Sequence, residues 1–108
     1  MDVKVTRFVT LYDNNCRKRH IHRRVKGKVI DFSLQLEIVV ENRWQPIVRY
    51  DTAHGFAHRD IVHPDGRTEK VALNISDLNE ALTFADKDLE MNWETYRHRF
   101  FKEVGEHD

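Results

Sequence analysis

The sequence has few of the residues that cross-link or interrupt a fold. Among 108 residues there are one cysteine, two prolines and four glycines. The lone Cys16 excludes an intramolecular disulfide and a cysteine-rich zinc site. No apolar run exceeds a few residues, so we expect no membrane-spanning segment, and the first residues lack the apolar stretch of a signal peptide. The length predicts one domain, residues 1–108, and we expect it in the cytoplasm.

Net charge is absent too, but its distribution is uneven. The formal net charge is zero. Residues 1–50 carry 11 Lys or Arg against 5 Asp or Glu, whereas residues 51–108 carry 7 against 13. The positive charge is densest at residues 17–28. The basic and histidine side chains of this segment are Arg17, Lys18, Arg19, His20, His22, Arg23, Arg24, Lys26 and Lys28.

Such a dense basic segment repels itself unless an anion neutralises it. Nucleic-acid phosphate is the usual partner of such a segment, so we predict that these nine residues bind nucleic acid, RNA rather than DNA. Two alternatives to nucleic-acid binding stay open at this point. In the first, the segment is solvated or pairs with the acidic half of its own chain. In the second, it binds an acidic protein.

The hydrophobic pattern over the first three-quarters of the chain predicts β-strands. Residues 3–12 are rich in Val, Thr, Phe and Tyr, and residues 32–40 alternate apolar and polar side chains with a period of two. Further strands are predicted at residues 47–51, 57–62 and 68–75. We expect residues 17–28 to form a loop or the ragged start of the second strand. The sequence therefore predicts an antiparallel meander of four to five strands.

Helical spacing then replaces the alternation. From residue 78 to residue 104, apolar side chains recur every three or four positions, with Ser76 as the expected N-cap and Gly105 as the expected end. The fold class is α+β, with this helix packed on the apolar face of the sheet. A helix of about 42 Å exceeds the roughly 34 Å width of a compact domain of this size. It therefore overhangs, bends near residues 85–88, or packs against a second copy in a homodimer. Side chains outside the main apolar stripe that could cover such a contact are Phe84, Met91 and Phe101.

Strand registers follow from the rule that apolar side chains share one face. A loop at residues 42–44 and turns at 54–55 and 64–66 satisfy this rule. These registers place Glu37 opposite Arg49, Asp51 opposite His58 and Asp60 opposite Lys70. The polar face is predicted to carry Gln35, Glu37, Arg49, Asp51, His58, Asp60 and Lys70.

Asp51 and His58 form the most reactive pair on that predicted face. A carboxylate beside an imidazole fixes its tautomer and suits general acid–base catalysis. Arg49 and Lys70 could stabilise the charge of a phosphate at this place. Our candidate catalytic residues are therefore Arg49, Asp51, His58 and Lys70, in a metal-independent, ribonuclease-type reaction. Cross-strand salt bridges on a solvated sheet would give the same pattern, and this alternative stays open.

A metal site is a further candidate among the histidines. Along a straight strand, the four residues from His54 to His58 span about 13 Å, too far for one ion. His58 and His63 point to opposite faces. Only His58 with Asp60, and Asp51 across the ladder, could share an ion. We predict no metal and no other cofactor.

The segment 47–60 resembles the Arg-Tyr-Asp…His…His signature of TumE-like proteins, which are small proteins often paired with DNA-binding antitoxins. The matching positions are Arg49, Tyr50, Asp51, His54 and His58. The C-terminal Trp-x2-Tyr pattern, Trp93 and Tyr96, is similar as well. The resemblance implies a small α+β toxin-like fold, a ribonuclease-type role and an antitoxin protein as partner.

Three functions follow from these observations. The first is a small cytoplasmic protein that interacts with nucleic acid and acts as a ribonuclease-type toxin. The second is a non-enzymatic module that binds nucleic acid or a protein. The third is a structural protein that forms a dimer through its helix.

Overall fold

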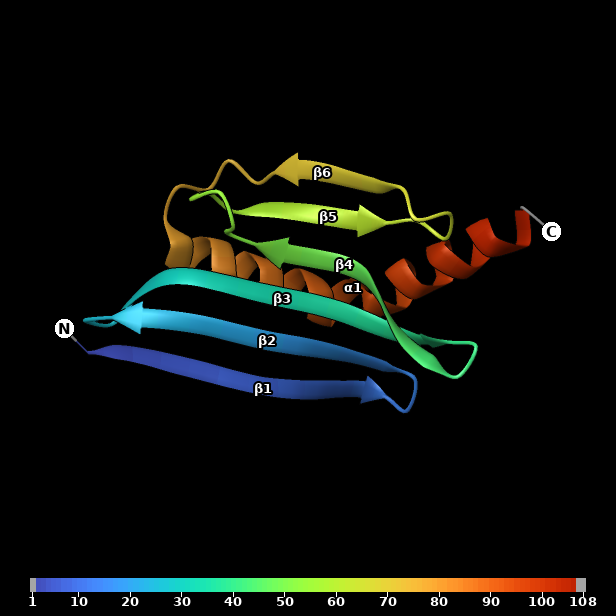
Figure 1. Cartoon of the computed structure of the whole chain (residues 1–108), viewed down its shortest axis with the longest axis horizontal. Coiled ribbons are helices and arrows are strands. Elements are labelled where there is room, and N and C mark those ends of the chain that lie inside the picture. The colour runs from blue at the N-terminus through green and yellow to red at the C-terminus, as the bar shows by residue number, and fades with distance from the viewer. Residues whose placement is uncertain (1, 107–108) are drawn as a thin grey trace.

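The computed structural model describes residues 2–106 as one antiparallel sheet with one long helix on its back. The strands lie side by side in chain order (Figure 1). Their bounds are β1 Val3–Asp13, β2 Cys16–Val25, β3 Lys28–Val40, β4 Arg43–Asp51, β5 His58–Val62 and β6 Thr68–Ala72, and α1 spans Leu78–Glu106. The α+β class and the meander are confirmed.

The predicted number of strands is wrong, because there are six and not four to five. The additional strand is β2, which we expected as a loop or a ragged strand start. Lys26 and Gly27, both with positive φ, make the tight turn into β3. Paired on both sides, β2 directs alternate basic side chains to opposite faces, so that they do not all repel one another on one surface.

The registers predicted for the later strands are confirmed. Asp51 pairs with His58 across β4 and β5, and Asp60 pairs with Lys70 across β5 and β6. The turn after Asp51 includes Gly55 at a φ of 83°, in the left-handed region that favours glycine. These turns fix which side chains face one another in the candidate site.

The register predicted between β3 and β4 is wrong by two residues. Gln35, not Glu37, pairs with Arg49, and Ser33 pairs with Asp51. The hairpin turns at Glu41 and Asn42, both with positive φ, and a bulge interrupts the ladder between Leu36 and Glu37. Pro46 lies opposite Glu37 and has no N–H for the ladder. A shift of two residues preserves the predicted faces.

The core lies between the central strands and α1. Apolar side chains from β3 and β4 pack against the helical stripe, and their burial drives the association of the two layers. The fully buried ones include Leu34, Leu36, Ile38, Val48, Tyr50, Ala85 and Leu89. Tyr50 extends across the interface and donates a hydrogen bond to Asp88 Oδ2 at 2.6 Å.

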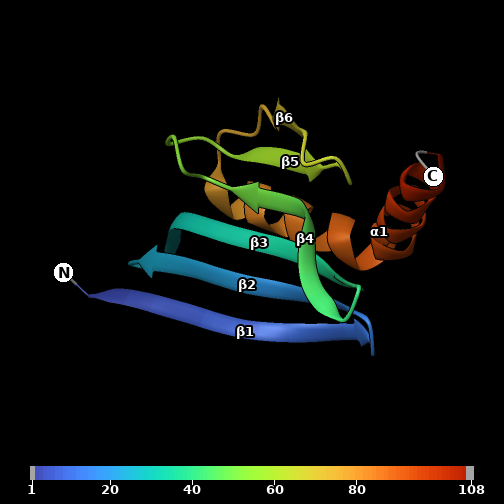
Figure 2. The same cartoon turned by 45° about the vertical axis from the view of Figure 1, so that its right-hand side comes forward.

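Both ends of the helix differ from the prediction. Asp77, not Ser76, caps its start, because Asp77 Oδ1 accepts hydrogen bonds from the backbone N–H groups of Asn79 and Glu80. Gly105 lies within the helix and does not end it. The helix runs behind the sheet and its last turns curve away beyond the strands (Figures 1 and 2). The molecule is accordingly elongated, with extents of 52 × 27 × 21 Å. In residues 2–106 we find no helix long and apolar enough to cross a membrane.

Candidate functional site

The candidate site lies on the sheet face turned away from α1, which we call the open face. Cross-strand pairing places a continuous set of polar side chains there. It carries Arg7, Arg17, Arg19, Arg23, Gln35, Arg49, Asp51, His58, Asp60 and Lys70. All four candidate catalytic residues are on this face, as predicted.

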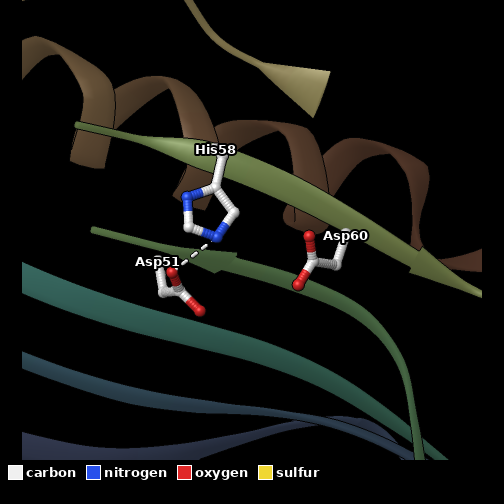
Figure 3. Close-up of side chains that lie close together, drawn as sticks. All are labelled: Asp51, His58 and Asp60. Carbon is white, nitrogen blue, oxygen red and sulfur yellow. Dashed lines mark ion pairs between the residues drawn. The ribbon is translucent and has the colours of Figure 1, made fainter. Parts of the chain in front are cut away.

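Asp51, His58 and Asp60 form a compact cluster on the open face, which we call the carboxylate–histidine cluster. His58 Nε2 lies 2.8 Å from Asp51 Oδ1. One ligand atom from each of the three side chains lies within 4.8 Å of the other two. Figure 3 shows their polar ends facing one another across β4 and β5. The cluster combines two carboxylates with one imidazole.

His58 is enclosed although it lies on the open face. Only 1% of its side chain is exposed, against 20% for Asp51. The turn before β5 encloses it, with the ring centroids of His54 and Phe56 at 6.0 and 5.8 Å from that of His58. A ligand can therefore approach the cluster through Asp51 and not through the imidazole itself.

The two candidate cations have different partners. Arg49 donates a hydrogen bond from Nε to Gln35 Oε1 at 3.1 Å. Lys70 Nζ lies 3.9 Å from Asp60 Oδ1, beyond hydrogen-bond distance. Asp60 is 5% exposed, and its Oδ1 is buried without a hydrogen-bond partner in the described part of the chain. The cluster thus keeps a buried acceptor that no nearby donor satisfies.

The nine residues predicted to bind nucleic acid do not share one surface. Lys18, His20 and His22 are buried on the helix side of β2, where Lys18 pairs with Asp86 of α1. His22 also contacts Arg24. Lys18 therefore links the sheet to the helix, which agrees with the alternative that the segment pairs with the acidic half of its own chain. His20, His22 and Arg24 line a hollow that residues of α1 line on its other side.

The histidines on the helix side are set to remain neutral. His20 Nε2 lies 2.6 Å from His22 Nδ1, and Phe8 stacks on the His20 ring. Burial lowers the pKa of His20 to about 4, and the charge of Lys18 acts in the same direction. Burial and the charge of Arg24 likewise lower the pKa of His22. We call Lys18, His20, His22 and Arg24 the buried basic cluster.

The remaining basic residues of the segment are exposed or partly exposed. Arg17 pairs with Glu37 at 2.6 Å and lies over the ring of Trp44, and Arg23 pairs with Asp31. The side chains without such an acidic partner in residues 2–106 are Arg19, Lys26 and Lys28. Of these three, Arg19 lies on the open face.

The open face is hollowed beside the carboxylate–histidine cluster. One hollow of about 530 Å³ is lined by Arg7, Val9, Arg19, Ile21, Ser33 and Gln35. A second, of about 450 Å³, is lined by Ile21, Arg23, Asp31, Ser33, Asp51 and Ala53. The two hollows adjoin at Ile21 and Ser33, and we call them together the groove; Asp51 lines the second of them. Sequence reasoning missed Arg7, which the register of β1 places on the face of Arg19.

Fold and site together define a small α+β protein whose polar sheet face carries a carboxylate–histidine cluster. The family model described as Domain of unknown function (DUF7718) matches residues 2–106, and the chain belongs to this family. Comparisons with curated proteins and with solved structures found no match. The resemblance to TumE-like proteins stays a prediction.

Proposed function

We propose that this protein binds single-stranded nucleic acid, RNA rather than DNA, in the groove of the open face. The observation that carries the proposal is that two arginines without an acidic partner lie close together at the groove. Arg7 and Arg19 line the same hollow, and neither has an acidic partner in the described part of the chain. Arg7 pairs with Ile21 across β1 and β2, so Arg19 is the diagonal neighbour of Arg7. The Cα atoms of such neighbours lie about 7–8 Å apart. An anion between them relieves their repulsion.

The other lining of the groove suits an unpaired strand. Val9 and Ile21 provide an apolar floor between the two arginines. Single-stranded RNA is recognised by splayed bases that stack on aromatic rings or guanidinium planes while cations contact the phosphates. Ser33 and Gln35 add hydrogen-bonding groups to the same floor. An exposed sheet face with such lining accommodates an extended chain better than a duplex.

Fluorescence anisotropy with a short labelled RNA tests this function. We expect binding that weakens steeply with salt, because phosphate contacts release counterions. Arg7→Gln and Arg19→Gln should each weaken binding roughly three- to tenfold and reduce the salt slope by about one. Arg67→Gln, in the exposed turn between β5 and β6, is the matched control and should change neither. Salt-insensitive binding, or unchanged affinity in the double variant, contradicts the proposal.

A ribonuclease-type reaction is the second candidate. The contact between Asp51 and His58 at the groove favours it, because that pair could take up a proton beside a bound phosphodiester. RNA cleavage that persists in EDTA and is lost in His58→Ala supports the metal-independent mechanism. Undiminished cleavage in His58→Ala contradicts it. Binding without cleavage in the wild type leaves the binding module as the function.

A further inference from the structure

The carboxylate–histidine cluster has the composition of a cation site. Asp51, His58 and Asp60 are the one group of three potential ligands found among residues 2–106. Their ligand atoms lie within 4.8 Å of one another. Bonds of about 2.0–2.2 Å place two ligands of one ion at most roughly 4.4 Å apart. A movement of a few tenths of an ångström would bring all three atoms into contact with one ion.

A second, independent observation is the unsatisfied carboxylate of Asp60. Its side chain is only 7% exposed, and Oδ1 accepts no hydrogen bond from any described residue. Lys70 is the nearest cation, and its Nζ lies at 3.9 Å and is half exposed. Buried charges are ordinarily paired or bound to a metal. The open acceptor therefore lies where a cation would bind.

The alternative neutralising groups point elsewhere. Arg49 is the cross-strand partner of Asp60, yet its Nε is directed to Gln35. His58 is held by Asp51 on one side, and its Nδ1 is buried without a partner in the described chain. Asp51 is thus paired with His58, whereas Asp60 has Lys70 alone among the described cations, at 3.9 Å.

We propose that Asp51, His58 and Asp60 bind one divalent first-row transition-metal ion, such as Zn²⁺ or Mn²⁺. Imidazole suits zinc and carboxylates suit manganese, so the mixed donor set favours these ions over Ca²⁺, which takes six to eight oxygens. The ion enters from the groove, where Asp51 is partly exposed. His58 Nε2 binds the ion as a lone-pair donor, so the ring proton resides on Nδ1 when the site is filled. This site does not depend on the proposed binding of RNA.

Titration calorimetry of the EDTA-treated, dialysed protein with ZnCl₂ and with MnCl₂ tests the site. We expect one ion per chain and a rise in melting temperature of at least about 5 °C at saturation. Asp60→Asn and His58→Gln should weaken binding at least roughly tenfold. Glu69→Gln removes a carboxylate next to Lys70 on the other face, so it is the matched control and should leave binding unchanged.

The Lys70→Gln variant should change the metal affinity in the opposite direction to Asp60→Asn and His58→Gln. Removal of a positive charge beside Asp60 should strengthen metal binding severalfold, because the lysine repels the ion. Circular dichroism checks that each variant is folded. If the His58→Gln variant does not fold, the Asp51→Asn variant is titrated in its place, together with Asp60→Asn. The absence of saturable binding in the wild type, or equal binding in Asp60→Asn, overturns the proposal, as does binding that is lost in His22→Gln instead.

Discussion

The sheet holds buried histidines on both of its faces. His20 and His22 lie on the helix side of β2, and His58 lies with Asp60 on the open face of β5. All four residues are less than one-tenth exposed. The difference is the charge of their neighbours, which is positive in the buried basic cluster and negative in the carboxylate–histidine cluster. Burial alone therefore does not indicate a site, and the sign of the surrounding charge separates a packed histidine from a candidate ligand.

The largest expected effect concerns acid stability. His20 has its pKa lowered to about 4, so the unfolded chain binds more protons than the native state between pH 6.5 and 4. The contribution of His20 is therefore complete above pH 6.5 and is lost as the pH falls toward 4. We expect a loss on the order of 2–3 kcal/mol from this group. Urea unfolding at pH 7, 5.5 and 4.5 measures it.

His20→Phe should flatten this loss, because the new ring can still stack on Phe8 and carries no titratable group. His63→Gln is the control over the same range, from pH 6.5 to pH 4, where it should leave the acid loss in place. Its hydrogen bond with Glu103 raises the pKa of His63, so its contribution is complete below pH 6.5 and declines only as the pH rises. An acid loss that persists unchanged in His20→Phe would show that the buried basic cluster does not govern acid stability.

Replacing one carboxylate at each cluster by an amide should change the free energy of unfolding by a smaller amount, with opposite signs at the two clusters. Asp86→Asn leaves the buried Lys18 without its counter-charge and should destabilise the protein by about 1–2 kcal/mol. Asp60→Asn removes a buried charge that has no hydrogen-bond partner at Oδ1, and should stabilise the metal-free protein by about 1 kcal/mol. Denaturant unfolding in EDTA compares the two. Destabilisation by both changes to the same extent would remove the distinction between the clusters.

Much of the open face could be predicted from the sequence. The turns at His54-Gly55 and Pro64-Asp65-Gly66 carry strong local signals, and they set the pairing of Asp51 with His58 correctly. Alternation fixed the faces of β3 because one side is apolar. These features depend on local backbone preference and on burial, which the order of residues reveals directly.

The unpredicted features depend on partners far apart in the sequence. Strand β2 was missed because its inward side chains are Lys18, His20 and His22, whose burial requires Asp86 on the helix and Phe8 on β1. Arg7 was missed for a similar reason, since only the register of β1 places it beside Arg19. The turn at residues 41–42 and the bulge together displaced β4 by two residues, so Arg49 and Asp51 keep their predicted face, whereas Pro46, beyond the bulge, lies on the face of Glu37.

A crystal of the protein soaked in MnCl₂ and measured for anomalous scattering tests the contrast between the two clusters most directly. We predict one peak about 2.0–2.2 Å from Asp51 Oδ, His58 Nε2 and Asp60 Oδ1, and none at His20 and His22. A peak at the two β2 histidines, or an empty position between Asp51 and Asp60 at saturating manganese, would contradict the account.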